Sequence, residues 1–220
     1  MSDLGNTPAW PNLNDGDCRQ EAVVLLGEEL ADRLARIRLM VFDCDGVLTD
    51  GRLIYGSEGE ALKQFHAHDG LGLVLARVAG LKRAVLTGRN SGIVHRRCTE
   101  LRFDSIKLGR FDKMAALNEI LTETGCEAGE TLYMGDDFID LPAMLAVGVA
   151  VAVPDAPREV RDAAALVTSR QGGHGAVREV VDHVLKSAGL FNVALERLGD
   201  RAWHPTREEL SSDADGGLTQ

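Results

Sequence analysis

The chain has 220 residues, of which 34 are acidic and 24 basic, so its formal net charge is −10. This length suits one domain with extensions and leaves no room for a second large domain. The acidic balance argues against nucleic acid as a partner. Four cysteines without CxxC spacing indicate reduced thiols, and we find neither a secretory signal nor an apolar stretch long enough for a membrane span. The composition therefore predicts a cytoplasmic protein that does not associate with membranes.

Both ends of the chain differ in composition from its middle. Residues 1–19 are polar and predict a disordered arm, whereas apolar residues at helical spacing predict one helix over 20–38. Residues 190–198 have a further helical pattern, and the acidic, glycine-rich residues 211–220 predict disorder. We therefore expect a folded domain over 38–188, between an N-terminal arm and helix (1–37) and a partly disordered C-terminal extension (189–220).

Between these ends, short apolar runs alternate with helical patterns. Such alternation predicts a doubly wound α/β fold, with a mostly parallel, Rossmann-like sheet joined by right-handed helical crossovers. Ligands of such sheets bind at the carboxyl ends of the strands. The expected strands span 39–42, 84–86, 105–108, 131–134, 149–153 and 166–167, and the expected helices span 71–79, 91–101, 111–124, 138–146, 156–164 and 175–187.

One interval after the first strand breaks this alternation. Residues 52–55 and 61–65 are short runs on either side of the glycine-containing segment 56–60, and this pattern predicts a β-hairpin. The insertion is too short to form a separate cap domain. His66 and His68 would share one face if this region were a strand, but no third metal ligand is evident. We therefore expect them to contact substrate or to lie on an exposed hairpin.

The first strand ends in the sequence Asp43-Cys44-Asp45-Gly46. Because side chains alternate along an extended segment, Asp43 and Asp45 project to one side and Cys44 to the other. Burying two carboxylates at the end of a strand costs free energy unless a cation lies between them. In proteins this cation is usually a divalent metal that also binds a phosphate. The pair therefore indicates a phosphoryl-transfer site, although an exposed acid pair in a turn would read the same way.

Three further signals follow later predicted strands. The segment Thr87–Asn90 gathers a hydroxyl, glycine amides and a cation at a helix N-terminus, where an anion is well placed. Lys113 lies in the first turn of the next helix, and Asp136 and Asp140 can face one region if a helix begins between them. Each signal alone is compatible with an ordinary cap, turn or solvated lysine. The occurrence of all of them together, at one edge of one sheet, is not explained by ordinary caps, turns and solvated lysines.

The chain resembles the haloacid dehalogenase superfamily of phosphotransferases, whose four motifs occur in a fixed order. The matching parts here are residues 43–47, Thr87, Lys113 and residues 135–140. Within that superfamily, residues 38–188 resemble the 3-deoxy-D-manno-octulosonate 8-phosphate phosphatase family. The closer resemblance is carried by residues 42–51, Lys63 with Phe65, Asp69-Gly70, 87–89, 135–137 and 172–179. The long ends depart from the shorter family form, and some relatives have arginine where His68 stands.

The resemblance implies a capless phosphatase that acts with Mg²⁺ through an aspartyl phosphate. Asp43 would be the nucleophile, and Asp45 would protonate the leaving alkoxide and later activate water. Mg²⁺ would be held by Asp43, by the backbone carbonyl of Asp45 and by Asp136. On this view the two acids of the first motif have different roles.

Further residues would complete this site. Thr87 would donate a hydrogen bond to a phosphate oxygen, and Lys113 would offset the crowded negative charge. Asp137 and Asp140 would orient Lys113 or metal-bound water from behind these groups. Candidates for binding the sugar acid are Lys63, Asp69, Gly70, Gly88, Arg89, Asn90 and Arg178, of which the arginines suit a carboxylate or phosphate. The glycine-rich segment 172–179 either closes over a neighbour's site or only forms the turn into the last helix.

The implied substrate is 3-deoxy-D-manno-octulosonate 8-phosphate, a precursor of the inner sugar of bacterial lipopolysaccharide. Two alternatives stay open: the phosphatase of a nonulosonate 9-phosphate, and a non-catalytic oligomerisation module. The family form also implies a homotetramer in which a neighbouring subunit covers the site. The hairpin would then pack against a partner through Leu53, Ile54, Tyr55 and Leu62, unless it folds back on its own core.

Overall fold

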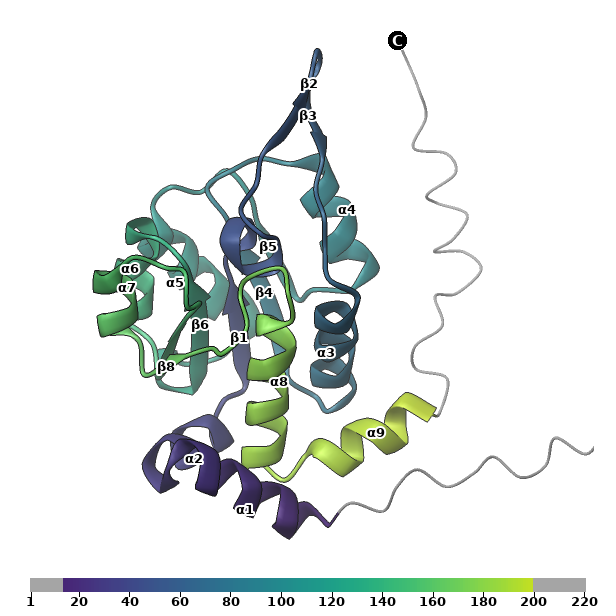
Figure 1. Ribbon diagram of the computed structural model, residues 1–220, viewed down its shortest axis with the longest axis vertical. Coiled ribbons are helices and arrows are strands. Elements are labelled where there is room, and N and C mark those ends of the chain that lie inside the picture. The colour runs from purple at the N-terminus through teal and green to yellow at the C-terminus, as the bar shows by residue number, and fades with distance from the viewer. Residues whose placement is uncertain (1–13, 200–220) are drawn as a thin grey trace, which may run out of the picture.

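The computed structural model describes residues 14–199, which fold around one six-stranded sheet (Figure 1). All neighbouring strands are parallel, in the order β5-β4-β1-β6-β7-β8. Each of the six predicted strands is present, with ends within two residues of the prediction. The strands are β1 (Leu39–Phe42), β4 (Lys82–Leu86), β5 (Ser105–Lys107), β6 (Thr131–Gly135), β7 (Val149–Ala152) and β8 (Leu166–Val167).

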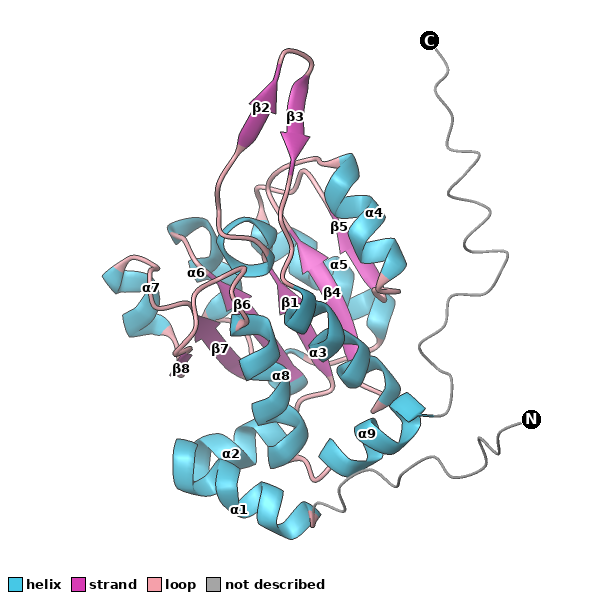
Figure 2. Cartoon of the chain, turned by 45° about the vertical axis from the view of Figure 1, so that its right-hand side comes forward, coloured by secondary structure: helices cyan, strands magenta, loops and turns pink. Residues whose placement is uncertain are grey.

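Helices cover both faces of the sheet. α3 (Ala67–Val78) and α8 (Ala176–Ser187) pack side by side on one face, and α5 (Lys113–Thr124) lies on the other (Figures 1 and 2). Parallel strands enclosed in this way are apolar on both sides, and all four residues of β1 are buried. The predicted doubly wound α/β class is therefore confirmed. Three further helices complete these layers: α4 (Gly92–Glu100), α6 (Leu141–Met144) and α7 (Arg158–Ala163).

The N-terminal residues form two helices where the sequence pattern predicted one. α1 (Asp15–Leu26) begins after Asn14, whose side chain caps the first turn, and α2 spans Glu28–Ala35. Gly27 separates them because its φ of 82° lies in the region that glycine adopts readily. The predictions of one continuous helix and of disorder through residue 19 are therefore wrong. Residues 1–13 lie outside the described part of the chain.

Both described ends pack onto the same face of the domain. α1 and α2 pack against α8, while α9 (Phe191–Gly199) contacts α3 and α8 (Figure 1). Arg19 of α1 donates a hydrogen bond of 2.6 Å to the carbonyl of Ser187. The predicted helix near 190–198 is thus confirmed, and the predicted disorder of 211–220 falls outside the described residues.

No helix within residues 14–199 combines the length and the apolar character that crossing a membrane requires.

The start of α3 differs from the prediction by four residues. α3 begins at Ala67, so His66 precedes its first turn and His68 lies within that turn, rather than on a strand or hairpin. Their rings meet edge to face, with centroids 5.1 Å apart. The expectation of an exposed hairpin is therefore wrong for these two histidines, and contact with substrate stays a prediction.

The predicted helix over 138–146 is also shorter than expected. It consists of one 3₁₀ turn, Phe138–Asp140, followed by the four residues of α6. Asp137 caps this turn, and the Asp140 side chain bonds back to the backbone N–H of Asp137. This reciprocal capping favours a tight turn over a regular helix and fixes Asp140 close to the end of β6.

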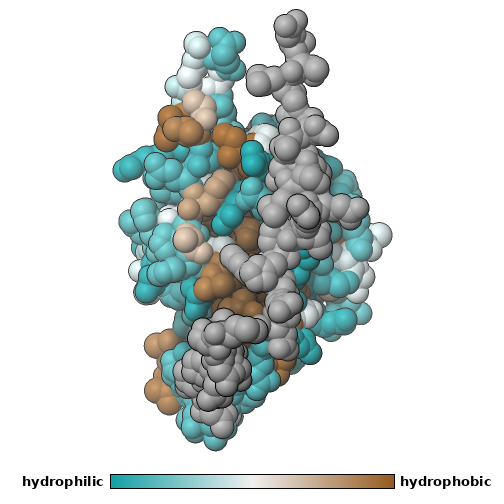
Figure 3. Space-filling model, turned by 90° about the vertical axis from the view of Figure 1, so that its right-hand side faces the viewer, coloured by the Kyte–Doolittle hydropathy of each residue, from teal (hydrophilic) through white to brown (hydrophobic). Residues whose placement is uncertain are grey.

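The predicted hairpin is present after β1. β2 (Ile54–Gly56) and β3 (Gly59–Leu62) pair antiparallel with a register shift, and they project away from the sheet (Figures 1 and 2). Its four apolar side chains are 37% to 60% exposed, and Figure 3 shows hydrophobic surface below the hairpin tip. In the single chain the hairpin therefore does not fold back on its own core.

Candidate active site

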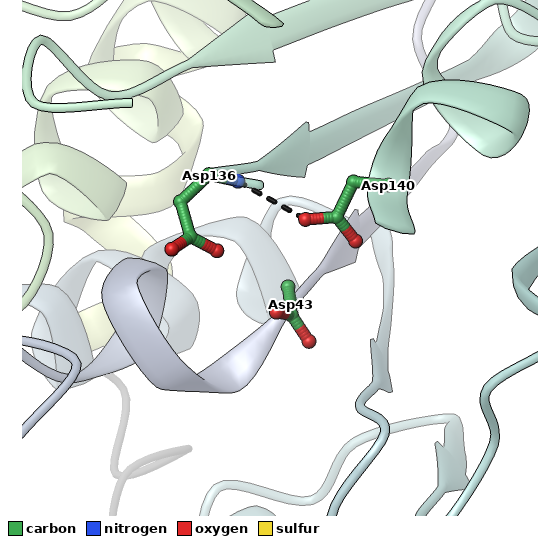
Figure 4. A group of neighbouring side chains, drawn as sticks. All are labelled: Asp43, Asp136 and Asp140. Atoms are coloured by element: carbon green, nitrogen blue, oxygen red, sulfur yellow. Dashed lines mark hydrogen bonds between the residues drawn. The ribbon is translucent and has the colours of Figure 1, made fainter. Parts of the chain in front are cut away.

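Three carboxylates meet at the carboxyl ends of the two central strands. Asp43 follows β1, Asp136 follows β6, and Asp140 lies in the 3₁₀ turn beyond it (Figure 4). One oxygen of each lies within 4.8 Å of the others. The parallel register produces this meeting, because Phe42 at the end of β1 pairs with Met134 of β6.

Lys113 neutralises part of this cluster from the first turn of α5. Its buried Nζ lies 2.9 Å from Asp43 Oδ1, 3.0 Å from Asp140 Oδ1 and 2.9 Å from the carbonyl oxygen of Leu86. An ammonium group has three N–H donors, so these three acceptors satisfy it completely. Burial alone would lower the pKa of Lys113, but the two carboxylates outweigh burial and raise it. Lys113 is therefore a fixed positive charge.

Asp140 holds the site together through both of its oxygens. Oδ1 accepts a hydrogen bond of 2.7 Å from the Tyr133 hydroxyl, besides its contact with Lys113. Oδ2 accepts from the backbone N–H groups of Asp136, at 3.1 Å, and of Asp137, at 3.3 Å. Because four donors occupy this carboxylate, it suits a supporting role better than metal ligation. The Asp137 side chain is exposed and bonds the N–H of Phe138, so it does not reach Lys113.

The remaining two carboxylates fit a divalent cation. Burial, followed by the charges of Asp43 and Asp140, raises the pKa of Asp136 to about 8. Burial and the charge of Asp140 also raise the pKa of Asp43, against the opposing effect of Lys113. Acids held in this way bind protons unless a cation replaces them. The Asp136 carboxylate also requires glycine at position 46, because a Cβ on Gly46, whose φ is +88°, would lie 2.1 Å from Asp136 Oδ2.

The carboxylate of Asp45 belongs to a different group of side chains. It accepts a hydrogen bond from Lys63 Nζ, and its Oδ2 lies 3.8 Å from Nε of Arg89. Lys63 also pairs with Glu60, at 3.1 Å. Asp43 and Asp45 thus have different surroundings: the first faces Lys113 and the acidic cluster, and the second faces two cations.

The loop after β4 forms another side of the site. Thr87 is buried, and Ser91 caps α4 by accepting a hydrogen bond of 3.3 Å from the N–H of Val94. A Cβ on Gly88 would lie 3.3 Å from the ring of Phe111, so the loop packs closely against that exposed aromatic side chain. Arg89 donates a hydrogen bond to the Tyr55 hydroxyl and thereby ties this loop to the hairpin.

The predicted substrate-binding residues form two groups. Lys63 belongs to the hairpin, and Gly88, Arg89 and Asn90 belong to the loop after β4; of these, Lys63 and Arg89 contact Asp45. Asp69 is instead buried in α3, where it accepts hydrogen bonds from the backbone N–H groups of Gly175, at 3.2 Å, and Arg178, at 2.8 Å. Gly70 packs against Arg97, and the Arg178 side chain pairs with Asp182 at 2.8 Å.

The contacts of Asp69 hold the segment before α8 in place. The backbone N–H of Gly173 donates a hydrogen bond of 3.0 Å to the carbonyl of Val47. Gly172 lies so close to the first motif that a Cβ there would be 1.7 Å from the carbonyl oxygen of Gly46. This segment is thus a brace for the turn that carries Asp45.

Sequence reasoning did not identify three side chains of the site: Tyr133, Glu60 and Ser91. A tyrosine within a buried strand could have been a signal, since its hydroxyl needs a partner there. Ser91 could have been recognised from its position at the start of a helix. Nothing in the sequence pattern distinguishes Glu60 from the other acids of the hairpin.

Comparison with known proteins supports the resemblance to haloacid dehalogenase-like hydrolases. Residues 103–180 match the model of the haloacid dehalogenase-like hydrolases. The chain is 42% identical over 164 residues to the 3-deoxy-D-manno-octulosonate 8-phosphate phosphatase of Haemophilus influenzae, covering 74% of this chain and 91% of that protein. It is 39% identical over 171 residues to the enzyme of the same name from Escherichia coli K12, covering 76% and 91%.

A solved structure has the same fold. The 3-deoxy-D-manno-octulosonate 8-phosphate phosphatase of Moraxella catarrhalis, in complex with a magnesium ion, a phosphate ion and a KDO molecule, aligns with a TM-score of 0.74 and 37% identity. The alignment covers 77% of this chain and 98% of that one. The chain belongs to the 3-deoxy-D-manno-octulosonate 8-phosphate phosphatase family of haloacid dehalogenase-like hydrolases.

Proposed function

We propose that the protein is a Mg²⁺-dependent phosphatase that hydrolyses 3-deoxy-D-manno-octulosonate 8-phosphate to 3-deoxy-D-manno-octulosonate and phosphate, in the supply of lipopolysaccharide precursor. The observation that carries this proposal is the separation of two neighbouring acids. Asp43 lies against Lys113 and close to Asp136, whereas Asp45 pairs with Lys63 and Arg89. The names of the relatives, which share most of this chain, support the substrate.

The chemistry would proceed in two displacements. A carboxylate oxygen of Asp43 attacks phosphorus, the bond from phosphorus to the sugar oxygen breaks, and the proton of Asp45 passes to that oxygen. Water, deprotonated by Asp45, then attacks the aspartyl phosphate and releases phosphate and free Asp43. Lys113 holds Asp43 in place throughout, and Thr87 would donate to a phosphate oxygen.

Mg²⁺ would be held by Asp43, Asp136 and the backbone carbonyl of Asp45. When bound, it neutralises charge on the transferring phosphoryl group. The raised pKa of Asp136 and the close approach of its carboxylate to the backbone at Gly46 support this assignment. For substrate binding we propose Lys63 and Arg89, which contact Asp45, with Gly88 and Asn90 from the same loop as Arg89, and we assign Asp69 to holding the segment that leads into α8.

The test is a phosphate-release assay over a panel of sugar-acid phosphates with Mg²⁺. The eight-carbon 3-deoxy-octulosonate 8-phosphate should have the highest kcat/KM, and the nine-carbon nonulosonate 9-phosphate should be slower. Asp43→Asn should lose at least about a thousandfold in kcat, because no nucleophile of comparable position is left. Asp155→Asn, at the exposed turn after β7, is the matched control and should leave kcat unchanged.

The two parts of this proposal can fail separately. A nine-carbon substrate that wins by a wide margin would overturn the substrate and leave the mechanism intact. Full activity of Asp43→Asn would overturn the mechanism.

We also propose that the protein acts as a cytoplasmic homotetramer. The exposed apolar side chains of the hairpin support assembly, since a monomer would leave them in water. The four cysteines are free and buried, in agreement with a reducing compartment, and cell fractionation would test this location.

A further inference from the structure

A chain of polar side chains leads from α4 through the hairpin to Asp45. The hydroxyl of Ser91 donates a hydrogen bond to Glu60, and the ammonium group of Lys63 bridges Glu60 and Asp45. Lys63 Nζ lies 3.1 Å from Glu60 Oε1. Glu60 and Lys63 of the hairpin therefore link the start of α4 to Asp45.

Lys63 depends on both of its carboxylate partners. Its side chain is only 1% exposed, and an ammonium group buried without compensating charge is strongly unfavourable. Glu60 supplies the second negative charge and accepts a hydrogen bond from Ser91. Ser91 is buried and also caps α4. Glu60 thus cannot turn away without breaking hydrogen bonds at both of its oxygens.

Asp45 in turn depends on Lys63. Its other cationic neighbour, Arg89, is farther away, at 3.8 Å from Oδ2, and the guanidinium of Arg89 is engaged by the Tyr55 hydroxyl. The Asp45 carboxylate is not part of the group that Asp43, Asp136 and Asp140 form. Lys63 is the nearer of its two cationic partners.

We infer that Glu60 is a positioning residue of this phosphatase, which acts through Lys63 to hold Asp45 where it meets the leaving group. The inference rests on the proposed function, because the position of Asp45 matters only if Asp45 transfers a proton. As the bond from Asp43 to phosphorus forms and the ester bond breaks, the electron pair of that bond stays on the departing oxygen. The proton of Asp45 neutralises it, provided that the carboxyl group is aimed correctly.

The experiment compares Glu60→Gln with the wild-type enzyme on three phosphate monoesters. They are 3-deoxy-octulosonate 8-phosphate, glycerol 3-phosphate and 4-nitrophenyl phosphate. The first two release a strongly basic alkoxide that needs a proton, whereas nitrophenolate is a weak base and leaves without one. We expect kcat/KM to fall about tenfold for both alkyl esters and less than about twofold for the nitrophenyl ester. Glu58→Gln, which removes one exposed charge from the same hairpin, is the control and should change none of the three.

Three other patterns in the Glu60→Gln variant would overturn the inference. A loss for the octulosonate ester alone would make Glu60 a contact of the sugar acid, and an equal loss for all three would make it merely structural. No loss would show that Lys63 holds Asp45 without help. If the wild-type enzyme hydrolyses the other two esters but not the octulosonate ester, the proposed substrate fails while the role of Glu60 is still measured on glycerol 3-phosphate.

A double-mutant cycle tests the route through Lys63. Because Glu60 is inferred to act only on this lysine, Glu60→Gln should cost nothing further in a Lys63→Met background with glycerol 3-phosphate. Thermal unfolding of each variant identifies any that fails to fold. If the two losses in kcat/KM multiply, Glu60 acts by some other route and the inference is wrong.

Discussion

Lys113 is held tightly within the site. Its three N–H donors reach two carboxylates and one backbone carbonyl, and its side chain is almost completely buried. Without it, Asp43 and Asp140 would face each other as buried like charges. The same lysine therefore supports both the fold and the proposed nucleophile, Asp43.

Replacing Lys113 by Met should strongly destabilise the protein. The change leaves two buried carboxylates without their cation, and removing one partner of such a group typically costs about 3–5 kcal/mol. Urea unfolding near neutral pH in the presence of EDTA measures the loss. Lys107→Met is the matched control, because Lys107 pairs at the surface with half-exposed Glu119 and Glu123 and should cost less than about 1 kcal/mol. Similar losses for the two variants would contradict the role given to Lys113.

At the scale of elements, the hairpin has two faces with different tasks. One side carries Glu60 and Lys63 toward Asp45, and the other leaves apolar side chains in solvent. An exposed group of this kind is typical of surfaces that pack against another chain. The hairpin would thus link assembly to the catalytic site.

We expect Leu62→Glu to break the proposed tetramer. Leu62 is 60% exposed in the single chain, and a carboxylate at a packed apolar interface would be buried without a partner. Sedimentation velocity should show a shift to smaller species. Val24→Glu provides the control, since Val24 is 77% exposed on α1 and should leave the assembly intact. A wild-type protein that sediments as a monomer would rule out the tetramer.

The elements also explain how much the sequence could predict. Asp43, Thr87, Lys113 and Asp136 could be placed together because each follows a buried strand, and parallel strands bring their carboxyl ends to one edge. The pairing of Glu60 with Lys63 could not be predicted in this way. Residues three apart on a regular strand face opposite sides, and only the irregular hairpin brings these two together.

Errors in the predicted fold have equally local causes. A single glycine, Gly27, divides the predicted first helix, because its φ interrupts the helix. The hydrophobic periodicity of the sequence continues across this residue and therefore does not reveal the break. Likewise, hydrogen bonds between side chain and backbone at Asp137 and Asp140 replace a predicted helix by a tight turn. Hydrophobic spacing identifies elements but not such interruptions.

For the whole molecule, the acidic cluster makes stability depend on pH and metal. The pKa of Asp136 is raised from its usual 3.8 to about 8, so the folded protein binds this proton more tightly than the unfolded chain. For an acid shifted in this direction, stability falls as pH rises from about 4 to about 8. Mg²⁺ binds the deprotonated form and should remove that loss.

Thermal unfolding should therefore show a stabilisation by Mg²⁺ that grows with pH. The Tm difference between excess Mg²⁺ and EDTA should be small near pH 5 and larger near pH 8, where protons no longer compete for the carboxylates. In the Asp136→Asn variant the Tm difference between Mg²⁺ and EDTA should be small at both pH values. An equal Mg²⁺ effect at the two pH values in the wild-type protein would contradict the assigned metal ligands.

The contact between Gly172 and Gly46 has a practical consequence for mapping this protein by mutagenesis. Alanine scanning truncates most side chains, but at a glycine it adds a carbon, so Gly172→Ala tests the brace behind Asp45 by insertion and not by loss. Here only the addition of a carbon is informative, because it would meet the Gly46 carbonyl at 1.7 Å. In a saturation library, tolerance at position 172 would therefore report on the backbone of the first motif, which lies more than a hundred residues earlier in the sequence.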